Sequence, residues 1–92
     1  MLNDPFVVDQ ASRWANRALA DGAVSPEDRA VRMFRRAMGR LPDEWETAAV
    51  MSALREFSKE RDLLESEWLS SQELWADLAQ SLFNLKQFIY LR

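Results

Sequence analysis

Hydrophobic residues recur at helical spacing in four segments of the chain, and each segment begins with a residue that caps helices well. The first segment follows Asp4-Pro5, which provides an N-cap and a proline suited to the first helical position. The second opens at Ser25 and stops at Gly39, a residue that readily takes the left-handed conformation that ends helices. We therefore predict two helices, the first ending near residue 20 and the second spanning residues 25–39.

The second half of the chain predicts two more helices. Asp43 is followed three residues later by Glu46, which is the spacing of a capping box. The fourth helix is expected to start at Ser70 or Ser71, and Ser70 has the same spacing to Glu73. Between these helices, residues 58–71 allow two interpretations: the third helix continues as an exposed charged rod, or it breaks near residue 60.

The segments together predict an all-α fold, a small four-helix bundle formed by one domain over residues 1–92. The fourth helix has the widest apolar stripe and is expected to be the most buried: Leu74, Trp75, Leu78, Ala79, Leu82 and Phe83. The apolar residues 88–90 are expected to fold back on the bundle near the start of the first helix, because a free apolar end would expose a large hydrophobic patch.

Composition limits the chemistry that the chain can perform. Its 92 residues include no Cys and no His, so the commonest metal ligands and the commonest general base are missing. We therefore expect no enzyme activity, no metal, no haem and no other cofactor. No apolar run approaches the ~20 residues that span a bilayer, so we expect no membrane insertion.

The segment from Arg29 to Arg40 holds five arginines and no acid, and four of them fall on one helical face: Arg29, Arg32, Arg36 and Arg40. One interpretation is a phosphate-binding stripe for nucleic acid or an anionic surface. The other is a solvated face paired with the acids of the third helix. The net charge of −3 favours the second, so we expect no nucleic-acid binding. Ordinary surface ion pairs likewise explain Glu56 and Glu60 of the third helix better than a paired-carboxylate site.

The four tryptophans divide into two pairs. Trp14 and Trp75 lie on predicted core stripes and are expected to pack inside. Trp45 and Trp68 do not lie on a predicted core stripe, so either is a candidate for a partner contact. With Phe88 and Tyr90 they form the candidate interaction surface, and an apolar patch there could also support a weak homodimer.

The turn between the second and third helices has a predicted structural role. Gly39 ends the helix, and Pro42 follows closely in the linker. Arg40 can meet the last carbonyls of the second helix, or the acids at the start of the third. We expect Arg40 to fix this turn.

Several segments also resemble a known family. Taken in order, residues 2–8, 34–42, 75–84 and 88–90 resemble the C-terminal subdomain of the planctomycete-specific domain family of unknown function. Lys86 and Gln87 depart from it, since Asn and Glu are usual there. The resemblance covers almost the whole chain except for residues 58–71.

The resemblance implies a fragment of a large exported or periplasmic bacterial protein that often carries a cytochrome-c-like region elsewhere. It implies no activity for this segment. The expected function is a non-catalytic helical subdomain that packs on or supports the rest of that protein. The alternatives are a stand-alone protein-interaction module and an anionic-surface or nucleic-acid binder acting through the Arg-rich second helix.

Overall fold

The structure is a computed structural model that describes the backbone of residues 4–90 and the side chains of residues 4–86. Its elements are α1 (Pro5–Ala18), α2 (Pro26–Met38), α3 (Glu44–Glu60), a short 3₁₀ helix η1 (Glu65–Ser70) and α4 (Gln72–Tyr90). No strand occurs in the described part of the chain, so the all-α prediction is confirmed.

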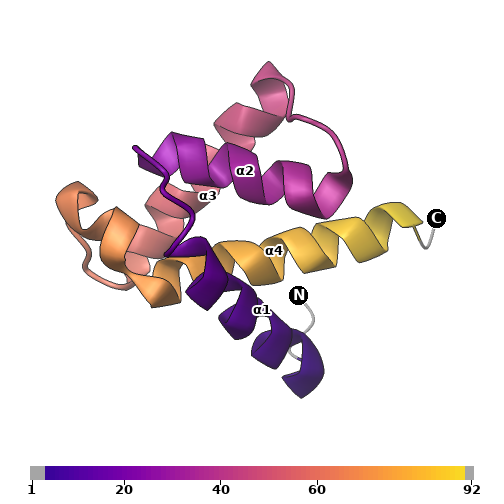
Figure 1. The fold of residues 1–92 in the computed structure, drawn as a ribbon, viewed down its shortest axis with the longest axis horizontal. Helices are drawn as coiled ribbons and strands as arrows, with labels where there is room; N and C mark the ends of the chain where they lie inside the picture. Colours follow the sequence, from indigo (N-terminus) through magenta and orange to yellow (C-terminus); the bar gives the residue numbers. More distant parts are fainter. Residues whose placement is uncertain (1–3, 91–92) are drawn as a thin grey trace.

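Helix α4 lies across the middle of the molecule and contacts the three other long helices (Figure 1). Helix α1 packs most extensively along α4, whereas α2 and α3 lie together on the opposite side of it. The helices cross one another obliquely in a body of 38 × 30 × 23 Å. Helices α1 and α2 make little direct contact with each other.

The predicted starts of α1 and α2 and the predicted end of α2 are confirmed by their caps. The Asp4 carboxylate accepts a hydrogen bond from the backbone N–H of Phe6 at 2.8 Å, and the Ser25 hydroxyl accepts one from Asp28 at 3.1 Å. Gly39 ends α2 with a φ of 76°, in the left-handed region. Helix α1 ends at Ala18, slightly before its predicted end.

Residues 58–71 form a break and not a charged rod. Helix α3 ends at Glu60, and the chain reverses through Asp62, whose φ is 54°. The hydroxyl of Ser58 donates to the carbonyl oxygen of Leu63 at 3.0 Å, and the backbone N–H of Leu63 donates to the carbonyl of Ser58 at 3.0 Å. The second bond gives a backbone carbonyl of the last turn of α3 a hydrogen-bond donor, and the pair of bonds holds the turn that leads to η1.

Helix α4 is capped by Ser71, whose hydroxyl accepts a hydrogen bond from the backbone N–H of Leu74 at 3.3 Å. Ser70 does not form the alternative capping box with Glu73. The Ser70 hydroxyl donates instead to the carbonyl of Glu67, and the Glu73 carboxylate binds Arg61. Of the two predicted starts of the fourth helix, Ser71 is correct.

The core is formed by side chains from all four long helices and from η1. Among the described residues, α1 and α4 each supply five buried apolar side chains, but those of α4 are larger and include three leucines and Trp75. As predicted, Trp14 and Trp75 are packing residues, whereas Phe83, also expected on the buried stripe of the fourth helix, is only half-buried. Trp14 meets Phe83 edge-on, with ring centroids 5.4 Å apart. The largest fully buried side chains are Trp75, Phe34, Leu54, Leu74 and Leu78.

The C-terminal residues continue α4 instead of turning back as a separate tail. The helix runs without interruption to Tyr90, because no Gly or Pro follows Pro42 to stop it. The packing of the Phe88, Ile89 and Tyr90 side chains lies outside the described residues.

Candidate interaction surfaces

The α2–α3 corner, residues 39–46, is held in one conformation by a paired arginine and glutamate. Both terminal nitrogens of the Arg40 guanidinium donate to the two carboxylate oxygens of Glu46, each at 2.7 Å. The same guanidinium lies 5.4 Å from the centroid of the Phe34 ring. The predicted structural role of Arg40 is confirmed, with Glu46 as its acidic partner.

A capping box strengthens the corner. The Glu46 carboxylate accepts from the backbone N–H of Asp43 at 2.9 Å, and the Asp43 carboxylate accepts from the backbone N–H of Glu46 at 2.8 Å. Hydrogen bonds from Arg40, and then from the Asp43 backbone, lower the pKa of Glu46 from 4.5 to about 2. Half-buried Pro42, with its restricted φ, completes the linker.

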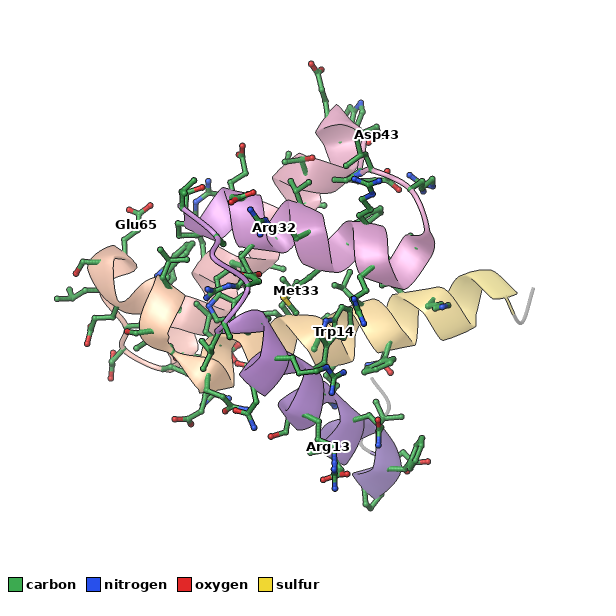
Figure 2. The ribbon with its side chains drawn as sticks, viewed as in Figure 1. Arg13, Trp14, Arg32, Met33, Asp43 and Glu65 are labelled. Carbon is green, nitrogen blue, oxygen red and sulfur yellow. The ribbon has the colours of Figure 1, made fainter. Side chains whose placement is uncertain are left out.

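This corner displays two large apolar side chains to solvent. Trp45 is 86% exposed and Leu41 is 59% exposed. Each is two residues from Asp43, the N-cap of α3, which is labelled in Figure 2. Trp45 is therefore accessible, as a partner contact requires.

Trp68, the second tryptophan of the candidate surface, is buried, so its expected place on that surface is wrong. It is only 4% exposed, and its indole N–H donates to the Ser58 hydroxyl at 2.8 Å. Its carbonyl oxygen accepts from the indole of Trp75 at 2.7 Å. The break after α3 folds η1 onto the core and carries Trp68 inside. Phe88 and Tyr90, the other two candidates, have side chains outside the described set.

The arginines of α2 do not form one solvated stripe. Arg29 is buried, with 3% exposure. One of its terminal nitrogens donates to the carbonyl of Leu69 at 2.7 Å, and the other lies 3.3 Å from the Asp21 carboxylate. Its guanidinium lies 5.1 Å from the centroid of the Trp75 ring. The sequence pattern did not predict that Arg29 is buried, although Arg29 lies one helical turn before the buried Met33.

The expected pairing of the arginine stripe with acids of α3 holds only for Arg40. Arg32 binds Asp28 of its own helix at 3.1 Å and the carbonyl of Asp21 at 2.6 Å. Arg36, and Arg35 beside it, are exposed and form no ion pair or hydrogen bond through their side chains with the described residues.

A surface groove of about 490 Å³ opens between α1 and α2, and we call it the α1–α2 groove. Trp14 and Met33, which lie close together in Figure 2 with Arg32 nearby, belong to its wall. The residues that line it are Trp14, Arg17, Ala18, Asp21, Arg32, Met33, Arg35 and Arg36. The groove thus combines an apolar floor with four arginines.

A second charged cluster, which sequence reasoning missed, joins the end of α3 to α4. The Arg61 guanidinium donates to Asp77 at 2.7 and 2.9 Å and to Glu73 at 2.9 Å. The Asp77 hydrogen bonds raise the pKa of Arg61. Arg61 therefore connects the end of α3 to α4.

Glu56 of α3 forms only an exposed ion pair with Lys59, at 3.4 Å, as expected of a surface carboxylate.

Two further kinds of feature are absent from the described residues. Among the side chains of residues 4–86, no group of three or more acidic residues is placed to hold a metal ion. None of the described helices combines the length and hydrophobicity needed to cross a bilayer.

In comparisons with known proteins, no family model, curated protein or solved structure matches this chain.

Proposed function

We propose that this chain is a non-catalytic helical subdomain that packs on the remainder of a larger exported bacterial protein. The observation that carries the proposal is the α2–α3 corner, where Trp45 is 86% exposed on a backbone held by the Arg40–Glu46 pair.

An exposed tryptophan on a rigid corner has the properties of an interface anchor. Burying a tryptophan removes about 150–250 Å² from water, and tryptophan is enriched among the residues that dominate binding energy. The capping box and the Arg40–Glu46 pair already order the backbone, so binding costs less conformational entropy than it would on a mobile loop. Leu41 extends the apolar centre, and the surrounding charged residues form a polar rim.

The remainder of the same chain is proposed as the partner because of the family resemblance described above. That resemblance also supports an exported or periplasmic location. The described residues support an interaction role in their own right, since the exposed corner is apolar and rigid whatever binds it.

The test is a calorimetric titration that measures binding between the 92-residue chain and the separately produced remainder of the full-length protein. Trp45→Ala is expected to weaken binding by about thirtyfold, the loss typical of an interface hot spot. Val24→Ala is the matched control, because Val24 is equally exposed but lies in the α1–α2 connection. The proposal fails if the remainder does not bind, or if Trp45→Ala binds as tightly as Val24→Ala.

A further inference from the structure

The α1–α2 groove carries positive charge that the described protein leaves unneutralised. Arg17 comes from α1, and Arg32, Arg35 and Arg36 come from α2 at spacings that place them along one side of that helix. Arg17, Arg35 and Arg36 have no ion pair or side-chain hydrogen bond among the described residues.

The acid in the lining does not cancel this charge. The Asp21 carboxylate already accepts from the backbone N–H of Ala23 at 2.8 Å and lies 3.3 Å from the buried Arg29 guanidinium. Asp21 is therefore occupied by its own neighbours. Three guanidinium groups remain available for carboxylate oxygens, which arginine can bind with two parallel hydrogen bonds.

The floor of the groove is apolar, which distinguishes it from a plain anion site. Atoms of Trp14, Ala18 and Met33 line it. A volume of about 490 Å³ lies within the range of small-ligand pockets and accommodates one apolar side chain with its neighbouring backbone. The preferred ligand thus has one hydrophobic group flanked by negative charges.

The charge distribution of the whole chain favours a short acidic peptide over a polynucleotide or an anionic membrane. The chain carries a net charge of −3, so its excess acids lie outside this groove. A long polyanion or an extended anionic surface would meet those acids and be repelled, whereas a short segment meets only the groove. We propose that the α1–α2 groove binds an acidic peptide segment of a partner protein, with an apolar residue on the floor and carboxylates on the arginines.

The proposal is tested by fluorescence anisotropy with a fluorescein-labelled peptide in which one central leucine is flanked on both sides by glutamates. We expect saturable binding that weakens at high salt, because the charge pairs are exposed. Replacing the glutamates by glutamines is expected to abolish binding, and replacing the leucine by glycine is expected to weaken it.

Two double variants with the same charge change locate the site. Arg35→Gln with Arg36→Gln is expected to weaken binding by about fivefold, since each exposed charge pair contributes a factor of about 1.4 to 5. Arg55→Gln with Lys59→Gln removes two exposed charges from α3 and is expected to change binding by less than about twofold. Melting curves check that both variants remain folded.

The proposal is overturned if no saturable binding occurs below about 1 mM peptide, or if the α2 and α3 variants bind equally well. It is also overturned if duplex DNA or phosphatidylglycerol vesicles bind more tightly than the peptide and lose that binding in the α2 variant. Trp45→Ala should leave peptide binding unchanged, so failure of this proposal and failure of the corner interface are distinguishable.

Discussion

Replacing Arg29 by methionine is expected to destabilise the protein strongly, although the substitution keeps a long side chain in the same space. Arg29 is 3% exposed and joins α2 to η1 and to the α1–α2 connection. Methionine fills much of the same volume, but it cannot donate a hydrogen bond to the Leu69 carbonyl or form an ion pair with Asp21. The Leu69 carbonyl would then lose its charged donor.

The size of the effect follows from the three contacts. The hydrogen bond to Leu69 at 2.7 Å involves a charged donor, and such bonds contribute about 1.5–3 kcal/mol. The contact with Asp21 is long, at 3.3 Å, and Asp21 is 21% exposed, so it contributes at most about 1 kcal/mol. Packing of the guanidinium on Trp75 contributes about 1–2 kcal/mol. The methionine avoids the cost of burying a charge, which offsets part of the sum, and we expect a net loss of about 2–4 kcal/mol.

The assay is urea unfolding monitored by circular dichroism, with thermal melts in parallel. For a domain of this size the expected loss lowers the melting temperature by about 10–25 °C. Arg55→Met is the control, because Arg55 is exposed on α3, and its stability should stay within about 0.5 kcal/mol of the unsubstituted protein. If Arg29→Met unfolds at the same urea concentration as Arg55→Met, the buried guanidinium does not stabilise the fold.

Three further substitutions test other parts of the structure by urea unfolding. Gly39→Ala should cost about 1–2 kcal/mol from its φ of 76° alone, because nothing lies within 4 Å of the added Cβ; a loss above about 3 kcal/mol would point to a clash instead. Ser58→Ala should cost about 1–3 kcal/mol, because the buried Trp68 indole N–H loses its acceptor; adding Trp68→Phe should cost less in this background than in the native one, and equal costs would disprove the coupling. Glu46→Gln should be less stable than the native protein at pH 7, because it weakens the pair with Arg40. The native pKa of Glu46, about 2, lies below the ordinary 4.5, so this stability difference should be complete above about pH 5 and disappear as the pH falls toward 2; a difference that does not change down to pH 2 would contradict the assignment.

Local signals in the sequence were enough to place the helix ends. Asp4, Ser25 and Asp43 cap their helices as predicted, and Gly39 adopts the left-handed conformation expected of it. Each of these signals acts within about four residues, through a side-chain-to-backbone hydrogen bond or a backbone dihedral. Arg40 was predictable for the same reason, since its partner Glu46 lies on the same short corner.

The candidate site was only partly predictable, because exposure depends on which elements meet. Trp45 and Trp68 were equally good candidates in the sequence, yet Trp45 is 86% exposed and Trp68 is 4% exposed. The difference arises because α3 breaks after Glu60 and η1 folds onto the core. No local signal decides that packing.

The arginines of α2 show the same division between local pattern and tertiary contact. Arg29 and Arg36 share a helical face in the sequence, but Arg29 is buried against the Leu69 carbonyl, forty residues along the chain, while Arg36 borders the α1–α2 groove. Arg61 likewise finds Asp77 sixteen residues away, on another helix. The sequence by itself determined the helices and their caps, because those interactions are local. Only the tertiary structure decided which charges are buried, paired or left facing solvent, because helix crossings bring together residues far apart in the chain.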